Sequence, residues 1–225
     1  MLLFGVNESF VSRELHHIIP IIYWYYEKDI VWPSSETRKE LEGTLDIDKN
    51  AIASMDFTIT PRKHSALNDE YYRGDKHQPF LNSFGVSDFR GIFLNFEPGF
   101  QGRAADQHSF VLTHLGKGDL QLEDNQRILA DGGFSSRDDR IQTPYTYEDS
   151  VDIRRHKANR CSIETDFRTL KIMKAAAEKS RHSASFQALS IGAIARLRNH
   201  FIRKRLDNGI ILYDILDAQV NTHKQ

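Results

Sequence analysis

The stretch FLNSFGVSDFRGIFLNFEPG (80–99) decides the fold, because it predicts two adjacent antiparallel strands. Apolar residues recur through residues 80–87 and 91–97, and turn-forming residues lie between the two segments, from Asp88 to Gly91. Short connections of this composition join neighbouring strands into a hairpin. We therefore expect a sheet that contains an antiparallel hairpin near the middle of the chain.

Further strands are expected on both sides of this hairpin. GTLDID (43–48) is a short segment expected to form one strand. FTIT (57–60) is expected to form another, because apolar and polar β-forming residues alternate within it. In RILADGGF (127–134), three apolar residues precede Asp131 and two glycines, a pattern typical of a buried strand that ends at a sharp turn. IQTPY (141–145) predicts one more short strand.

Helices are expected between and after these strands. DQHSFVLTHL (106–115) predicts a helix with Asp106 as its cap or first-turn acid, and the chain reads as helical from about residue 150 to 205. In NRCSIETDFRTLK (159–171), the apolar residues recur at helical spacing and predict one buried stripe: Ile163, Phe167 and Leu170. The order of elements predicts a mixed α/β sheet with helices packed over it.

Residues 1–26 are compatible with a helix-turn-helix, in which Gly5 ends a first helix and Asn7 caps a second. A short turn with glycine occurs in DNA readers, but it also joins many other helix pairs. Ser34 or Ser35 is expected to cap another short helix. Because the chain begins abruptly inside an apparent element, we expect that an upstream segment is missing.

Length and composition exclude several classes of protein. A chain of 225 residues suits one domain, or one domain with a small appendage, and a single cysteine excludes an internal disulfide. No apolar run approaches the roughly 18 residues that cross a membrane. The ten histidines lack zinc-site spacing, and the phosphate-loop and serine-hydrolase motifs are absent from the sequence.

The charge is distributed unevenly along the chain. Residues 151–205 contain 14 Lys or Arg and 4 Asp or Glu, whereas the whole chain contains 30 and 31. A segment of net charge +10 therefore lies within a chain of net charge −1. This asymmetry indicates either a face that binds a polyanion or a solvated helical surface, and charge alone leaves both interpretations open.

Three acids occur where solubility does not require them: Asp46 in a β-forming segment, Asp131 after a buried strand, and Glu164 beside a buried helical stripe. Taken singly, they fit an edge acid, a turn former and an i,i+4 partner of Arg168. Taken together, such carboxylates can hold two divalent ions, which activate water and stabilise the leaving oxygen in phosphodiester cleavage. Magnesium and manganese prefer these oxygen ligands.

A series of motifs in order resembles the PIF/Harbinger class of DDE transposases and the Harbinger-derived nucleases. GTLDIDKNAI (43–52) resembles the family's first-acid strand, ILADGGF (128–134) followed by TPY its second-acid strand, and NRCSIETDFRTLKIM (159–173) its third-acid helix. The remaining matches are the hairpin and Asp-bearing helix (80–110), the helix-turn-helix (4–22), the linker IVWPS (30–34) and the closing helix ALSIGAIARLRNH (188–200). The resemblance covers roughly residues 3–200.

The resemblance implies an RNase H-like fold of three parts. Residues 1–42 would form a truncated helix-turn-helix-like segment and linker, residues 43–205 the nuclease domain, and residues 206–225 a tail. The implied catalytic and metal-binding triad is Asp46, Asp131 and Glu164. Asp48 is the rival for the first position, because it shares a strand face with Asp46. The position of Ile52 favours Asp46, and Asp106 would lie outside the triad.

The implied function is metal-dependent DNA endonuclease activity, with strand transfer as a further transposase-type reaction, supported by two Mg²⁺ or Mn²⁺ ions. Five residues are expected to contact DNA: Arg160, Arg168, Lys171, Ser9 and Arg13. The resemblance also implies a nuclear location, with the cytoplasm as a second one, and a separate Myb-like DNA-binding partner. We expect no membrane association and leave a homo-oligomer open. The alternative function is a domesticated, non-catalytic scaffold that binds DNA or protein.

Overall fold

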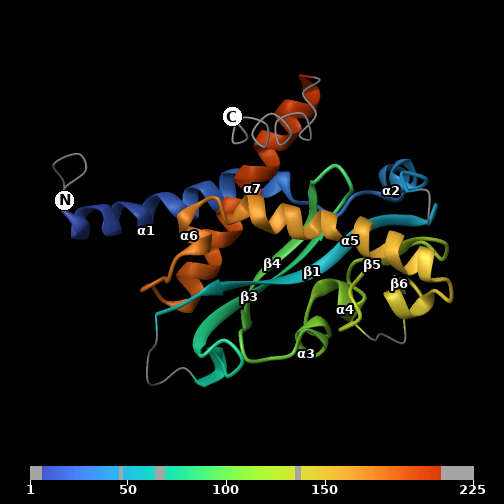
Figure 1. The fold of residues 1–225 in the computed structure, drawn as a ribbon. Coiled ribbons are helices and arrows are strands. Elements are labelled where there is room, and N and C mark those ends of the chain that lie inside the picture. The colour runs from blue at the N-terminus through green and yellow to red at the C-terminus, as the bar shows by residue number, and fades with distance from the viewer. Residues whose placement is uncertain (1–6, 46–47, 64–68, 135–137, 209–225) are drawn as a thin grey trace, which may run out of the picture.

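The computed structural model describes residues 7–45, 48–63, 69–134 and 138–208, whose strands form one mixed sheet (Figure 1). Its central strand β1 (Ala51–Pro61) pairs antiparallel with β3 (Gln78–Ser87), and β3 pairs antiparallel with β4 (Phe93–Gln101). On its other side β1 pairs parallel with β5 (Arg127–Leu129), which pairs parallel with β6 (Ile141–Gln142). The short β2 (Tyr72–Arg73) pairs with the beginning of β3.

This topology confirms the predicted mixed α/β fold and its central hairpin. Three antiparallel strands followed by two parallel ones, in the order β4-β3-β1-β5-β6, are the arrangement expected of an RNase H-like sheet. The hairpin turn lies where the sequence indicated. The Asp88 carboxylate accepts from the backbone N–H groups of Arg90 and Ile92, at 3.0 and 2.9 Å. Gly91 has a φ of +87°, a conformation that favours a residue without Cβ.

Helices cover the sheet (Figure 1). The three long ones are α1 (Glu8–Tyr25), α5 (Ser150–Leu170) and α7 (Ala184–Asp207). The short ones are α2 (Ser35–Leu41), α3 (Asp106–Phe110), α4 (His114–Lys117) and α6 (Lys174–Ala177), and 3₁₀ turns occupy Glu27–Asp29, Asp69–Tyr71 and Pro144–Thr146. No helix in these described ranges is long and apolar enough to span a bilayer.

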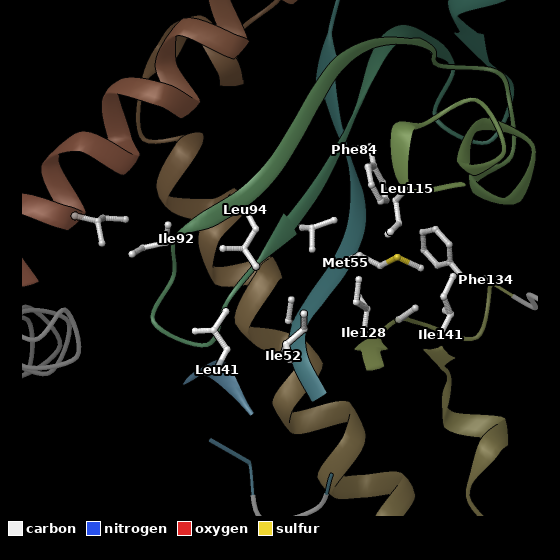
Figure 2. Packing of buried hydrophobic residues seen from close by; sticks show 14 residues of the cluster. Leu41, Ile52, Met55, Phe84, Ile92, Leu94, Leu115, Ile128, Phe134 and Ile141 are labelled. Carbon is white, nitrogen blue, oxygen red and sulfur yellow. The ribbon is translucent and has the colours of Figure 1, made fainter. Parts of the chain in front are cut away.

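Two apolar clusters form the core. Successive residues of β3 point to different clusters: Phe84 packs against Phe57 and Phe110, whereas Gly85 faces α5. A Cβ on Gly85 would lie 2.8 Å from the ring of Phe167, so glycine allows α5 to approach the sheet closely. Figure 2 shows the first cluster, which includes Leu41, Ile52, Met55, Ile92, Leu94, Leu115, Ile128, Phe134 and Ile141. The second contains the predicted α5 stripe, Ile163, Phe167 and Leu170.

Two sequence predictions near the amino terminus, the helix-turn-helix and the GTLDID strand, have different outcomes. Asn7 does cap a helix, because its Oδ1 accepts from the Phe10 N–H at 2.7 Å, but α1 is one continuous helix. The first helix of the expected helix-turn-helix falls on residues outside the described ranges, so that motif stays a prediction. The strand expected over GTLDID is wrong in its described part, since residues 43–45 and 48 belong to no strand and β1 begins only at Ala51.

A buried ion pair fixes α5 to its neighbours. Asp166 on α5 accepts from Arg198 of α7 at 2.6 Å and from the hydroxyl of Ser87, at the end of β3, at 2.6 Å. Arg198 also donates to the Gly91 carbonyl and to Thr169. The two charged side chains are only 5% and 8% exposed. This network joins α5, α7 and the hairpin at one point.

Breaking this pair should destabilise the fold. We expect Asp166→Ala to lower the free energy of unfolding by about 3–5 kcal/mol, because it leaves the Arg198 charge buried without its carboxylate. Urea denaturation followed by circular dichroism measures the change. The double variant Asp166→Leu/Arg198→Met is the control and should recover most of the loss. A loss under about 1 kcal/mol in the single variant would contradict the assignment.

Candidate active site

Two carboxylates lie side by side where β1 and β5 run parallel. Ser54 of β1 is opposite Leu129 of β5. Two residues further along the chain are Asp56, in the middle of β1, and Asp131, just after the end of β5, so the two carboxylates come abreast on the same face of the sheet. Their charges act on each other, and Asp106 at the start of α3 acts on both. The carboxyl edge of parallel strands is a common place for a functional site.

The carboxyl group of Asp56 has a strongly raised pKa. Its side chain is only 16% exposed, and its Oδ1 accepts from the Phe57 N–H at 2.7 Å. Burial raises the pKa of Asp56 to about 7, and the negative charges of Asp131 and Asp106 act in the same direction. The backbone hydrogen bond and Arg160 oppose this rise without cancelling it. A carboxylate with such a pKa, in a cluster of acids, is a candidate functional group.

Arg160 on α5 links Asp56 to Glu164. Its Nη1 donates to Asp56 Oδ2 at 3.1 Å, and its Nη2 donates to Glu164 Oε1 one helical turn further along. Burial opposes the charge of Arg160, but its bond to Glu164 and the charges of Asp56, Glu164 and Asp131 raise its pKa. Glu164 is thus bound to Arg160 and not to Arg168, which the sequence had offered as its i,i+4 partner.

The other predicted DNA contacts differ in how far they are buried. Lys171, at the end of α5, is half-buried; burial lowers its pKa, and the charge of Asp56 opposes that effect. Arg168 is exposed on the same helix. Ser9 and Arg13 are exposed on α1, where Arg13 pairs with Glu14. All of them stay predictions as DNA contacts.

A cavity of about 680 Å³ adjoins the acids. Asp106 and Gly133 form part of its wall, so it opens beside the Asp131 loop. Basic side chains contribute as well: Arg103 lines it, and Arg73 lines it while holding Asp75 through two hydrogen bonds of 3.0 and 3.1 Å. The cavity can admit a substrate segment beside the carboxylates.

The predicted first acid is not among the residues that the structure describes. Asp46 lies outside them, so its role stays a prediction. Asp48 lies before the amino end of β1, where its carboxylate accepts from the Asn50 N–H. About 17 Å of strand separate Ala51 from Asp56 at ~3.3 Å per residue, which places Asp48 at the far end of β1 from Asp131.

The donor chemistry suits a hard divalent cation, although the described arrangement is not a finished ligand set. Asp56 and Asp131 offer carboxylate oxygens near the end of β5, and a positive charge, that of Arg160, already lies among the acids. Within the described ranges, no three His, Cys, Asp or Glu side chains are grouped closely enough to hold a metal ion. Glu164 would have to exchange Arg160 for the ion.

Sequence reasoning missed Asp56, although a signal was present. AIASMDFTIT (51–60) is a largely apolar run interrupted by one acid, and the apolar run in RILAD (127–131) ends in one. Both segments form buried strands, and the acid of each lies near the level where β5 ends. The spacing of Gly43 and Asp46 favoured a different segment.

The comparisons with known proteins support a nuclease. A family profile described as DDE superfamily endonuclease matches residues 54–199. The matched range contains Asp56, Asp106, Asp131, Arg160 and Glu164, and it begins after Asp46 and Asp48. No curated protein and no solved structure gives a significant match.

Removing the Asp56 charge should stabilise the fold in a pH-dependent way. The pKa of Asp56 is about 7 in the folded protein and 3.8 as its ordinary value, so the unfolded chain releases this proton first. Wild type should therefore lose stability relative to Asp56→Asn as pH rises from about 4 to about 7, with a constant difference above that. At pH 8 the variant should be more stable by roughly 2–4 kcal/mol.

Urea denaturation in EDTA at pH 5, 6 and 8 measures this difference. Glu40→Gln, at an exposed position on α2, controls for general charge effects. A difference that is the same at all three pH values would show that the Asp56 carboxyl is not destabilised by its surroundings.

Proposed function

The chain belongs to the DDE superfamily endonuclease family, and from this premise we propose that it cleaves phosphodiester bonds of DNA with a divalent cation. We further propose the PIF/Harbinger type of transposase or transposase-derived nuclease, because the ordered motifs resemble that class. The observation that carries the proposal is the juxtaposition of Asp56 and Asp131, with Glu164 tied to Asp56 through Arg160.

We propose Asp56, Asp131 and Glu164 as the carboxylate set, with Asp56 in the position that the sequence had given to Asp46. Asp56 comes from the middle of β1, Asp131 follows the end of the adjacent β5, and Glu164 comes from the helix that packs on the same face. Mg²⁺ or Mn²⁺ bound by these oxygens would supply an activated nucleophile and would neutralise charge on the leaving oxygen. Water or a DNA 3′-hydroxyl forms the new bond to phosphorus, one P–O ester bond breaks, and the departing oxygen takes up a proton.

The remaining residues would position the DNA. Arg168 and Lys171 follow Glu164 on α5, in the segment of net charge +10, and phosphate contacts by such side chains fix a duplex without reading its sequence. The cavity beside Asp106, with Arg73 and Arg103, would accept the strand next to the cleaved bond. We propose a nuclear location and a separate Myb-like partner, following the resemblance.

Substitution of the acids tests the carboxylate set. In a plasmid-nicking assay with Mn²⁺, we expect Asp56→Asn, Asp131→Asn and Glu164→Gln each to lower the rate at least about 100-fold, because each removes a charged ligand. Asp46→Asn and Asp48→Asn are the matched controls and should retain nearly full activity.

The assay also decides between the two candidates for the first acid. Loss of activity in Asp46→Asn together with an active Asp56→Asn would restore the sequence-based triad. An inactive wild type that still binds DNA would favour the non-catalytic scaffold.

DNA affinity should depend on Arg168 through salt. Arg168→Ala is expected to weaken binding at 50 mM salt and to reduce the slope of log K against log salt by about 0.9, the value for one lost phosphate contact. Fluorescence anisotropy of a labelled duplex from 50 to 200 mM NaCl measures the slope. Lys39→Ala, at an exposed position on α2, should leave it unchanged; equal slopes in all three proteins would remove Arg168 from the interface.

A further inference from the structure

The guanidinium of Arg160 lies where the candidate ligands would meet a cation. It donates one hydrogen bond to Asp56 and another to Glu164, and its charge also acts on Asp131. The Arg160 side chain is only 14% exposed, unlike the surface i,i+4 pair Lys174–Glu178, whose side chains are 86% and 67% exposed. Arg160 is therefore a fixed part of the site.

The oxygen atoms of the two aspartates are not equivalent. Asp56 Oδ1 accepts from its neighbouring backbone N–H, and Asp131 Oδ1 accepts from the Gly133 N–H at 2.7 Å. The Asp56 oxygen without such a backbone donor is Oδ2, and that is the atom to which Arg160 donates. A metal ion and a guanidinium repel each other and would use the same electron pairs of Oδ2. Binding of either one there should therefore weaken binding of the other.

We propose that Arg160 is the resident counter-ion of the site, which holds Asp56 and Glu164 together in the metal-free protein and releases Asp56 Oδ2 when a divalent cation binds. This inference rests on the proposed function, because it takes both carboxylates as ligands. Arg160 is a positioning residue in this scheme, since it acts through the carboxylates.

The scheme gives Arg160 two successive partners. A guanidinium binds carboxylates and phosphates with the same forked geometry. Displaced from Asp56, it would remain anchored to α5 within one side-chain length of the acids, where a DNA phosphate can replace the carboxylate. The predicted role of Arg160 as a phosphate contact would thus follow the binding of the cation.

Competition of this kind has a measurable consequence, since removal of the competitor must tighten metal binding. We expect Arg160→Gln to lower the Kd of the DNA-free full chain for Mn²⁺ about tenfold, which corresponds to ~1.4 kcal/mol. Electron paramagnetic resonance of free Mn²⁺ gives this Kd directly. In wild type, titration with Mg²⁺ should also shift the Arg160 side-chain N–H resonance in NMR spectra.

Lys171→Gln is the matched control. It removes a charge that also acts on Asp56, yet no hydrogen bond joins these two described side chains. We expect its Kd to fall less than about threefold, since only long-range repulsion is lost. Equal gains in the two variants would mean that Arg160 acts by general electrostatics, and an unchanged or higher Kd in Arg160→Gln would overturn the proposal.

Two further variants separate the outcomes. Asp56→Asn should bind Mn²⁺ much more weakly than wild type; if wild type binds none, the proposed metal-dependent function fails and the counter-ion scheme fails with it. If Arg160→Gln does not fold, Arg160→Lys is the test. Lysine keeps the charge but lacks the planar fork of the guanidinium and should hold the two carboxylates less firmly, so the Kd should still fall below that of wild type.

Discussion

The parallel pairing of β1 with β5 is the constraint on which the candidate site depends. Ser54 and Leu129 face each other across this pair, and both are fully buried. Burial on both faces fixes the register, because a slip of one residue would exchange the faces of the sheet. The same slip would move Asp131 away from Asp56. The register of β1 against β5 therefore determines both the packing of the core and the proximity of the two carboxylates.

The docking of α5 completes this arrangement. The apolar stripe of α5 packs in the second cluster. Gly85 has no side chain, so α5 can approach the sheet closely. The Asp166–Arg198 ion pair then joins α5 to α7. At 100° per residue, positions 160, 164 and 171 fall within about 40° of one another on the helix surface. One guanidinium, one carboxylate and one ammonium group therefore face the strand acids along a single line.

The sequence predicted the architecture better than the site, for a physical reason. Local patterns of apolar and turn-forming residues, which can be read directly from the sequence, determine the hairpin, the strand before Asp131 and the long helices. Asp56 was missed because its acid interrupts a run that otherwise looks like plain core. The contact of Asp56 with Arg160 joins residues 104 positions apart. Such a contact depends on strand register and helix docking, which no local pattern encodes.

The electrostatic surroundings of Asp56 indicate why a further cation would stabilise this site. Two neighbouring carboxylates, of which one is largely buried, are unfavourable unless positive charge compensates them. Arg160 supplies one such charge, yet burial still holds the pKa of Asp56 near 7, far above its ordinary value. The compensation is thus incomplete in the metal-free protein. The remaining unfavourable free energy favours a cation of higher charge density, and in the proposed scheme Arg160 would yield its place because a DNA phosphate would offer it an equivalent partner.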